Sequence, residues 1–242
     1  MKLNKIIIAG GGTGGHIFPA IAVAHALQKM IPSIEILFVG AKGKMEMEKV
    51  PQAGFRIEGI DIAGFNRSKL FSNWKLPFML IRSFVQVRNI FKSFKPDAAF
   101  GVGGYSSFPV LRYAQQQGVA TFLHEANSFA GKSNLLLSKK ADLVMVGTLG
   151  MERFFDQDKM VYTGNPVRRE IVESYIKRIK DLEGLALDLV QAFGRHQILG
   201  AQDHQQLAHV HLGHDHFVEA LQHFTQVARQ RVQVAQVHMG DV

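Results

Sequence analysis

Five glycines and a histidine follow the first apolar run of the chain, in the order Gly10-Gly11-Gly12-Thr13-Gly14-Gly15-His16. Glycine lets the backbone turn sharply and lets a ligand approach the main chain, because it has no Cβ atom. Between a strand and a helix, such a turn aims free N–H groups at the ligand, which favours an anion such as a phosphate. Histidine titrates near neutral pH, so His16 is a candidate general base, or alternatively a group that hydrogen-bonds a phosphate or hydroxyl.

A second glycine turn follows another strand-like run and reads Gly101-Val102-Gly103-Gly104-Tyr105-Ser106-Ser107. Two polar stretches come later, His124-Glu125-Ala126-Asn127-Ser128 and Gly164-Asn165-Pro166-Val167-Arg168, and each again follows a strand-like run. Binding residues are expected at the carboxyl ends of parallel strands. The two glycine turns therefore indicate one long phosphorylated ligand or two ligands. Taken singly, the polar residues can also serve only as caps and turn formers.

The glycine pattern has a nucleotide-binding alternative. Gly10-x-Gly12-x-x-Gly15 matches the dinucleotide fingerprint, but the second strand ends in Gly40-Ala41-Lys42 instead of the acidic residue that binds the NAD ribose. Lys42 and Lys44 could face a 2′-phosphate, so an NADP-dependent reductase stays open. The Walker pattern is absent, because no Gly-Lys-Ser/Thr closes the turn.

Strand-like runs alternate with helical stretches in the first part of the chain. Strands are expected at 5–9, 35–39, 98–102, 120–124, 143–146 and 160–163. Helices are expected at 17–30, 74–94, 107–117 and 132–139. This alternation predicts an α/β fold, a Rossmann-like parallel sheet with helices on both faces that binds ligands at the carboxyl ends of its strands.

Composition narrows the class of protein. The chain is 47% apolar, so it can bury a substantial core. The absence of cysteine excludes disulfides and thiolate metal sites and is consistent with a reducing cytosol. The N-terminus lacks the layout of a signal peptide, and no window approaches the roughly 18 apolar residues of a membrane span. We therefore expect a cytoplasmic protein that meets a membrane, if at all, at its surface.

Four stretches together are more specific than any one of them: GGGTGGHIFPAIAVAHAL, GVGGYSSFP, HEANSFAGKSN and TGNPVRREI. In this order and spacing they closely resemble the N-terminal domain of the MurG family, bacterial transferases that add N-acetylglucosamine to undecaprenyl-diphosphate-linked muramyl-pentapeptide. The resemblance covers roughly residues 1–175 and implies the N-terminal half of a two-domain glycosyltransferase fold of the B type (GT-B). In the His-Glu-x-Asn box, Ala126 stands where glutamine is commoner, while Glu125 and Asn127 are retained.

The resemblance implies an inverting hexosyltransferase in which His16 is the candidate catalytic residue, with either base or positioning role. Contacts with the donor, UDP-N-acetylglucosamine, are implied for Thr13, Gly14, Gly15, Asn127 and Arg168. Contacts with the acceptor and its diphosphate are implied for Gly103, Gly104, Tyr105 and Glu125. We expect no metal and no cofactor, since residues 1–175 show no carboxylate pair or metal cluster.

The segment 66–95 combines aromatic and basic side chains, which suits the headgroup zone of an anionic bilayer. The residues assigned to membrane docking are Phe71, Trp74, Phe78, Lys69, Lys75 and Arg82. An ordinary amphipathic helix with a solvated basic face is the alternative. Nucleic acid is the rival partner for a basic surface, but no nucleic-acid-binding motif supports it.

The composition changes near Asp181. Residues 1–180 have a net charge of +12, from 25 Lys and Arg against 13 Asp and Glu, whereas residues 181–242 have −4, from 3 against 7. We therefore expect a Rossmann-like acceptor-binding domain at 1–175 and an atypical, mainly helical, His- and Gln-rich tail at 176–242, in place of the donor-binding domain. The clustered histidines that could bind a metal there, interpreted as composition only, are His209, His211, His214 and His216.

The expected function is N-acetylglucosamine transfer in peptidoglycan precursor synthesis, peripheral at the cytoplasmic face of the bacterial inner membrane. The expected partners are UDP-N-acetylglucosamine, the lipid-linked muramyl-pentapeptide and an anionic membrane surface, with no nucleic acid. Because the second domain is missing or replaced, this chain alone is expected to be inactive. The alternatives are the NADP-dependent reductase and a non-catalytic remnant that binds lipid-linked precursors.

Overall fold

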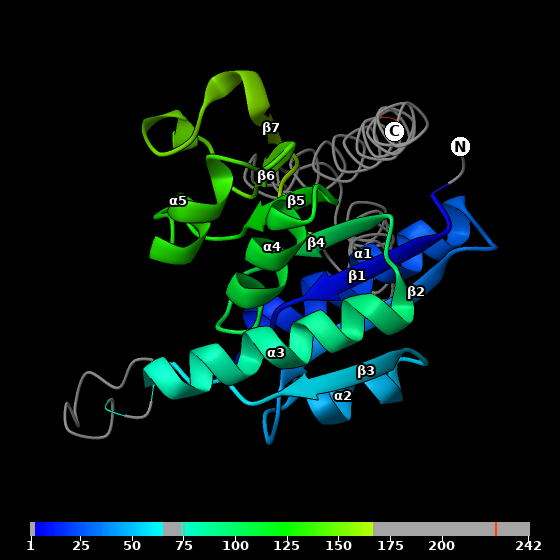
Figure 1. The fold of residues 1–242 in the computed structure, drawn as a ribbon. Coiled ribbons are helices and arrows are strands. Elements are labelled where there is room, and N and C mark those ends of the chain that lie inside the picture. Colours follow the sequence, from blue (N-terminus) through cyan, green and yellow to red (C-terminus); the bar gives the residue numbers. More distant parts are fainter. Residues whose placement is uncertain (1–2, 65–73, 75, 167–225, 227–242) are drawn as a thin grey trace, which may run out of the picture.

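The computed structural model describes residues 3–64, 74, 76–166 and 226 of the chain, and its core is one seven-stranded sheet (Figure 1). The strands are β1 (Lys5–Ala9), β2 (Glu35–Ala41), β3 (Arg56–Ile60), β4 (Ala98–Gly101), β5 (Ala120–Glu125), β6 (Leu143–Val146) and β7 (Met160–Tyr162). The helices are α1 (Gly14–Met30), α2 (Glu46–Gln52), α3 (Leu76–Phe94), α4 (Ser107–Gln116) and α5 (Lys132–Ser138), with 3-10 turns η2 (Met151–Arg153) and η3 (Gln157–Lys159).

The strand order is β3-β2-β1-β4-β5-β6-β7, and every neighbouring pair is parallel. The chain builds outward from β1 to β3, then crosses back through α3 to place β4 on the other side of β1. The crossing makes the β1–β4 boundary the topological switch point of a doubly wound sheet. In such sheets the ligand crevice lies at the carboxyl ends of the strands beside this point.

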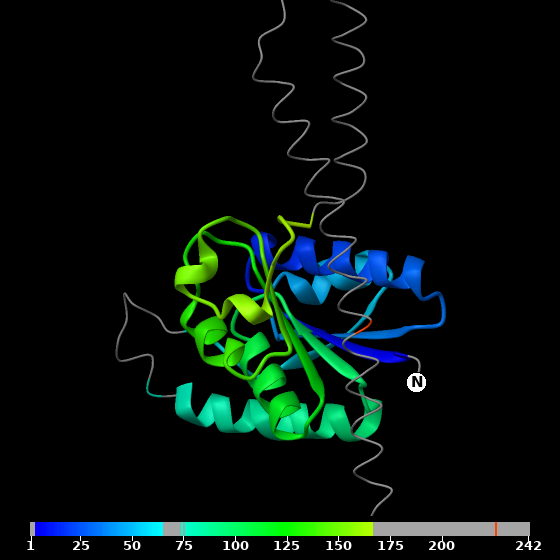
Figure 2. The same ribbon diagram turned by 90° about the horizontal axis from the view of Figure 1, so that it is seen from above.

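Helices cover both faces of the sheet, with α1 and α2 on one side and α3, α4 and α5 on the other (Figure 2). The side chains of β1 alternate between the two layers: Ile6 and Ile8 face α1, whereas Ile7 and Ala9 belong to the other core. A strand that is buried on both faces has a continuous apolar sequence, and residues 5–9 predicted a strand for this reason.

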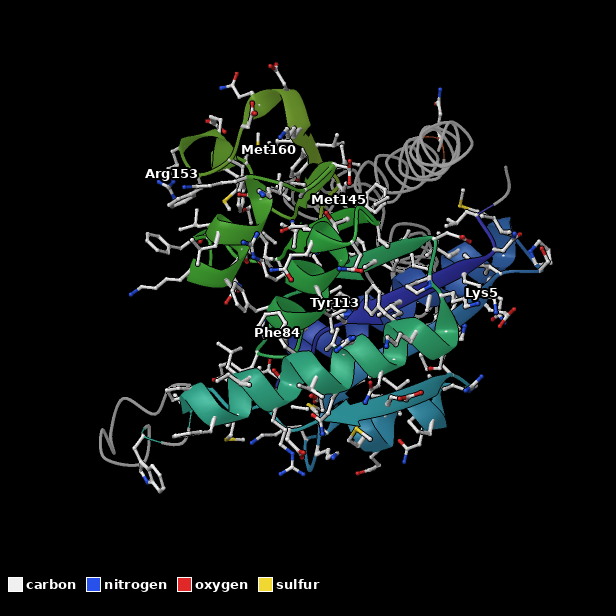
Figure 3. All side chains as sticks on the ribbon, in the orientation of Figure 1. Lys5, Phe84, Tyr113, Met145, Arg153 and Met160 are labelled. Carbon is white, nitrogen blue, oxygen red and sulfur yellow. The ribbon has the colours of Figure 1, made fainter. Side chains whose placement is uncertain are left out.

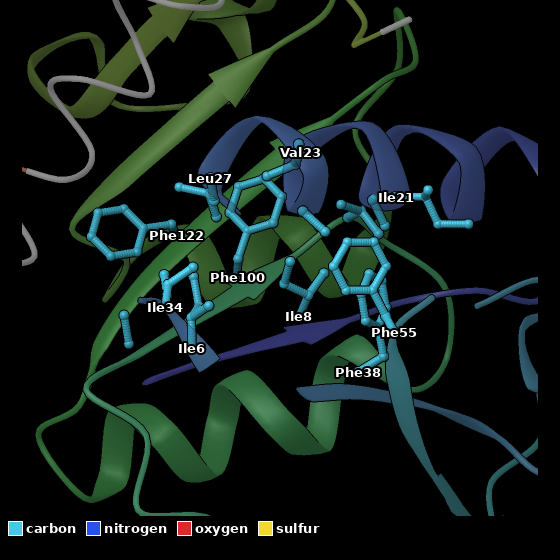
Figure 4. Close-up of a cluster of buried hydrophobic side chains, with 14 of the residues drawn as sticks. Ile6, Ile8, Ile21, Val23, Leu27, Ile34, Phe38, Phe55, Phe100 and Phe122 are labelled. Atoms are coloured by element: carbon cyan, nitrogen blue, oxygen red, sulfur yellow. The ribbon is translucent and has the colours of Figure 1, made fainter. Parts of the chain in front are cut away.

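The core beneath α1 is a row of large side chains across neighbouring strands (Figure 4). Ile8 of β1 is in register with Phe38 of β2 on one side and Phe100 of β4 on the other, and Phe100 is in register with Phe122 of β5. All four are at most 1% exposed. α1 packs on this continuous apolar surface. The surface therefore sets the distance of α1, and of the first glycine turn, from the sheet.

Two further sets of side-chain contacts stabilise the fold. One lies between α3 and α4, and the other lies at the amino ends of the strands. Tyr113 of α4 meets the Phe91 ring of α3 edge to face, with centroids 5.1 Å apart (Figure 3). At the amino ends of β1 and β4, an oxygen of Asp97 accepts the N–H groups of Asn4 and Lys5 at 2.8 and 2.9 Å. These bonds pin β4 beside β1, although the residues lie more than 90 positions apart.

The predicted fold class is confirmed, and the six expected strands are present with ends shifted by at most two residues. Among the strands and α-helices, two were not predicted, α2 and β3. The seven residues of α2 include Pro51, and the sequence of β3, RIEGI, lacks a clear apolar alternation because it forms the partly exposed edge of the sheet. The expected boundary at residue 175 and the tail, apart from residue 226, lie outside the described residues, so they stay predictions. Within the described residues, no helix is long and apolar enough to cross a membrane.

Candidate functional site

The two glycine turns touch each other at the switch point of the sheet. The first, Gly10–Thr13, joins β1 to α1, and the second, 102–106, joins β4 to α4. At Gly104, where φ is +84°, an added Cβ atom would overlap the carbonyl oxygen of Gly11. Glycine is therefore needed at Gly104 both for its backbone conformation and for the close approach of the two main chains.

A buried hydroxyl fastens this contact. The Oγ atom of Ser107, at the start of α4, lies 2.9 Å from the carbonyl oxygen of Ala9 and 2.7 Å from that of Gly103. One carbonyl belongs to the strand before the first turn, and the other belongs to the second turn. Ser107 therefore holds the second turn against the end of β1.

His16 lies between the two turns. Its Nδ1 atom is 3.0 Å from the hydroxyl of Thr13, and a Cβ atom added to Gly103 would lie 2.9 Å from its Nε2 atom. The half-buried imidazole at the start of α1 therefore rests on Gly103 of the second glycine turn. The hydrogen bond fixes the ring by one nitrogen and leaves Nε2 beside the second turn.

Tyr105 lies beside the first glycine turn and is 48% exposed. A Cβ atom on Gly64 would overlap its ring, and one on Gly12 would be 4.0 Å from it. The phenol is thus packed beside the first turn, while half of its surface is open to solvent. The structure therefore places predicted site residues of the first and the second turn side by side.

Glu125 ends β5 and organises the loop that follows. One carboxylate oxygen accepts the backbone and side-chain N–H groups of Asn127 at 3.1 and 2.9 Å, and the other accepts from Gly131 and from the side chain of Asn134 at 3.0 and 2.9 Å. Four donors use the ordinary capacity of a carboxylate. Glu125 is 3% exposed and orients Asn127, whose side chain is exposed. Direct contact between Glu125 and an acceptor diphosphate stays a prediction.

His124, one residue earlier, is fully buried and joins the loops after β5 and β7. Its Nε2 atom lies 3.2 Å from the carbonyl oxygen of Gly164, whereas Nδ1 has no hydrogen-bond partner. Burial lowers the pKa of His124, opposed by the Gly164 carbonyl and the Glu125 carboxylate. The ring is therefore neutral near pH 7, with the proton on Nε2. Asn165 continues the link by donating its amide to the carbonyl of Ala126 at 3.1 Å.

One carboxylate at the site, Glu46, was not among the residues singled out from the sequence. It begins α2, is fully buried, and accepts the N–H of Gly12 at 2.9 Å and that of Ala41 at 3.0 Å. Glu46 belongs to no recognised sequence motif, and the helix that carries it, α2, was not predicted. Of the predicted site residues, Arg168, Phe71, Lys69 and Lys75 lie outside the described residues.

An exposed apolar stripe runs along the start of α3. Trp74, Phe78, Ile81 and Val85 are 66%, 68%, 65% and 55% exposed. A cavity of about 510 Å³ lies at its base, lined by Asp61, Trp74, Phe78, Met79 and Arg82.

Asp61 anchors this stripe to the carboxyl edge of the sheet. Its carboxylate lies 2.9 Å from Arg82 and 3.1 Å from Lys42, and it accepts the Gln86 amide at 2.7 Å. The hydrogen bonds from Lys42 and Gln86 hold the pKa of Asp61 below its ordinary value. Lys42, which the reductase alternative needs for a 2′-phosphate, is thus paired with a carboxylate of the protein at an exposed position.

The strand order, and two glycine turns in contact at the switch point, define a Rossmann-like ligand-binding domain. The N-terminal domain of glycosyltransferase family 28 matches residues 6–146, and the chain belongs to this family.

The chain is similar to two curated proteins over about half of their length. Over 172 residues the chain is 53% identical to a protein of Cytophaga hutchinsonii, and the match covers 71% of the chain and 47% of that protein. Over 184 residues it is 50% identical to a protein of Phocaeicola vulgatus, covering 76% and 49%. Both are named UDP-N-acetylglucosamine–N-acetylmuramyl-(pentapeptide) pyrophosphoryl-undecaprenol N-acetylglucosamine transferase. The chain therefore spans about half the length of the curated relatives it matches.

Solved structures agree with this assignment. MurG of Acinetobacter baumannii superposes with a TM-score of 0.58 at 29% identity, covering 68% of the chain and 47% of that protein. The UDP-GlcNAc 2-epimerase of Neisseria meningitidis, with a TM-score of 0.51 at 17% identity over 80% of the chain and 55% of its own, shares the fold. The predicted resemblance to the MurG family is confirmed for the N-terminal part, and these relatives give no support to the reductase.

The contact between the turns makes Gly104 sensitive to substitution. Gly118→Ala is the matched control, because Gly118 has a similar φ of +71° but no neighbour within 4 Å of an added Cβ. We expect Gly118→Ala to cost about 1–2 kcal/mol of unfolding free energy, for its backbone conformation alone. Gly104→Ala should cost about 1–3 kcal/mol more, because the two main chains must separate. Urea unfolding measures both values, and equal losses would contradict the close contact.

Burial of His124 predicts a dependence of stability on pH. Its folded pKa lies below the ordinary value of 6.5, so the unfolded chain binds the proton more readily. Below about pH 6.5 the unfolding free energy should fall by up to about 1.4 kcal/mol per pH unit, until the folded pKa is reached. In His124→Gln, which can still donate to Gly164, this part of the slope should vanish in urea unfolding. His25→Gln, at an exposed position of α1, should keep the full slope, and an unchanged slope in His124→Gln would refute the assignment.

Proposed function

We propose that this chain is the acceptor-binding half of a GT-B transferase that moves N-acetylglucosamine from UDP-N-acetylglucosamine to undecaprenyl-diphosphate-linked muramyl-pentapeptide. The observation that carries the proposal is the placement of His16 between two touching glycine turns at the switch point. The names of the relatives give the substrates, and the family gives the reaction class, a hexosyl transfer.

His16 is the proposed general base. During an inverting transfer, the attacking sugar hydroxyl loses its proton as its oxygen bonds the anomeric carbon, and UDP leaves with the bonding electron pair. For Nε2 to accept that proton, the other ring nitrogen must carry a hydrogen. Thr13 supports this tautomer, because its hydroxyl oxygen lies 3.0 Å from Nδ1 and can accept the Nδ1–H. A role in positioning the hydroxyl stays open.

The proposed donor contacts are Thr13, Gly14, Gly15, Asn127 and Arg168. Gly14 and Gly15 open α1, whose first turn holds no acidic residue, so its free N–H groups can favour a diphosphate. Asn127 is exposed and held by Glu125. The proposed acceptor contacts are Gly103, Gly104, Tyr105 and Glu125, of which Glu125 would act through its loop.

A peripheral position on an anionic membrane at its cytoplasmic face is also proposed. The exposed stripe of Trp74, Phe78, Ile81 and Val85 supports it, since apolar side chains on one helix face suit the headgroup zone. Exposed cations on the same helix, Arg82, Arg88 and Lys92, would add attraction to anionic lipids. A lipid-linked acceptor requires this proximity, because its diphosphate lies at the membrane surface.

The transfer test uses residues 1–166 joined to the C-terminal half of the Cytophaga hutchinsonii relative. We expect this chimera to move labelled N-acetylglucosamine from UDP to a lipid-linked acceptor, while the 242-residue chain alone shows no transfer. In the chimera, His16→Ala should lower kcat by about 10²–10⁴-fold, the usual contribution of a general base.

His25→Ala is the matched control, because this exposed histidine lies on the same helix, and it should leave kcat unchanged. A loss of only a few-fold in His16→Ala would restrict His16 to positioning. A folded chimera that binds UDP-N-acetylglucosamine and transfers nothing would overturn the proposed function.

The membrane proposal predicts that Phe78→Ser combined with Ile81→Ser weakens partition onto vesicles rich in phosphatidylglycerol. Raised salt should weaken partition too, since each cation near such a surface contributes about 1 kcal/mol. Leu136→Ser is the control, because it removes a similarly exposed side chain, 60%, from α5. Sedimentation with vesicles measures partition, and circular dichroism checks the fold. Equal partition of both variants would identify α3 as an ordinary solvated helix.

A further inference from the structure

Glu46 connects two loops at the carboxyl edge of the sheet from a fully buried position. One oxygen of its carboxylate accepts the N–H of Ala41 at the end of β2, and the other accepts the N–H of Gly12 in the first glycine turn. The neighbouring glycines make room for it: a Cβ atom on Gly11 would overlap the carboxylate, and one on Gly40 would collide with its Cγ. The glycines Gly11 and Gly40 therefore accommodate a side chain of the protein.

The bonding of this buried carboxylate involves no cation in the part of the chain that the structure describes. Among the described residues, no lysine, arginine or histidine forms an ion pair with Glu46. Its partners are neutral backbone N–H groups. A buried charge is costly unless it is paired or hydrogen-bonded. Backbone N–H groups on a glycine turn are the same partners that a bound phosphate uses. Glu46 therefore makes, from inside the protein, the contact that an anionic ligand would make.

This occupancy limits what can bind to the first turn. An anion that took the Gly12 N–H would have to displace Glu46. The second turn differs, because no carboxylate contacts the N–H groups of Gly103 or Gly104 among the described residues. The contact also fixes the residues that follow, since Gly12 directly precedes Thr13, whose hydroxyl holds His16.

We propose that Glu46 is the built-in anion of the first glycine turn. Its carboxylate fills the phosphate position at Gly12, holds Thr13 and His16 in place, and leaves the acceptor diphosphate to the second turn. Glu46 is thus a positioning residue. The nature of the diphosphate ligand rests on the proposed function, whereas the occupancy of the first turn does not.

The test follows backbone amide signals of the ¹⁵N-labelled 242-residue chain by NMR, with inorganic pyrophosphate and formate as probes. In the wild type, pyrophosphate should shift the amides of Gly103 and Gly104 and leave those of Gly12 and Ala41 in place. In Glu46→Ala the vacated position should bind pyrophosphate at least tenfold more tightly at Gly12. Formate, a free carboxylate, should return the Gly12 amide and the displaced His16 imidazole signals toward their wild-type positions.

Two further variants provide an independent test and a control. Glu46→Gln keeps the shape but offers one acceptor oxygen, so one of the Gly12 and Ala41 amides should lose its bond and the His16 signals should move. Glu48→Gln, at an exposed site of the same helix, should match the wild type. If Glu46→Ala does not fold, unchanged Gly12, Ala41 and His16 signals in Glu46→Gln overturn the proposal.

The remaining outcomes separate this proposal from the proposed function. A wild-type Gly12 amide that pyrophosphate shifts as strongly as Gly104, or a folded Glu46→Ala that formate leaves unchanged, overturns the role of Glu46. If pyrophosphate shifts neither turn in the wild type but formate restores Glu46→Ala, the role of Glu46 stands, and the diphosphate ligand of the proposed function is refuted.

Discussion

The close approach of Gly11 and Gly104 is the constraint on which the rest of the site depends. Two main chains can touch in this way only where Gly104 carries no side chain and where their strands are neighbours. The strand order supplies the second condition by placing β4 beside β1. Once the turns are in contact, Ser107 can reach the carbonyl oxygens of Ala9 and Gly103, and His16 can rest on Gly103. The geometry around His16 is therefore a property of the sheet topology as much as of the turn that carries it.

Carboxylates that accept backbone N–H groups recur around this framework. Asp97 holds the amino ends of β1 and β4, Glu46 holds the first glycine turn, and Glu125 holds the loop after β5. Hydrogen bonds to a charged acceptor are stronger than neutral ones, and two oxygens can serve several donors at once. One carboxylate can thus fix a loop whose backbone forms no regular hydrogen-bonded strand or helix. At both ends of the sheet, charge serves to shape the backbone.

The sequence predicted the central sheet well, because strands buried on both faces leave continuous apolar runs such as Ile6-Ile7-Ile8. It also predicted both glycine turns, because a run of glycines between a strand and a helix is typical of such turns. It did not predict β3 or α2, where exposure and Pro51 obscure the pattern. Glu46 was missed for a related reason: its role depends on the distance between two loops that only the folded sheet brings together. The roles of His124 and Glu125 as loop organisers likewise needed coordinates, since their residue types suit direct ligand contact equally well.

The pairing of β1 with β4 has a further consequence, for the order in which the molecule folds. The bonds from Asp97 to Asn4 and Lys5 close a loop of more than 90 residues. Contacts so distant in sequence form slowly, because the chain must lose much conformational entropy before they stabilise it. During synthesis, β1 emerges long before β4, and its apolar edge must wait unpaired, a situation in which chains are prone to aggregate. The switch point is thus both the place where a ligand can bind and the boundary of the sheet that joins the neighbouring strands most distant in sequence.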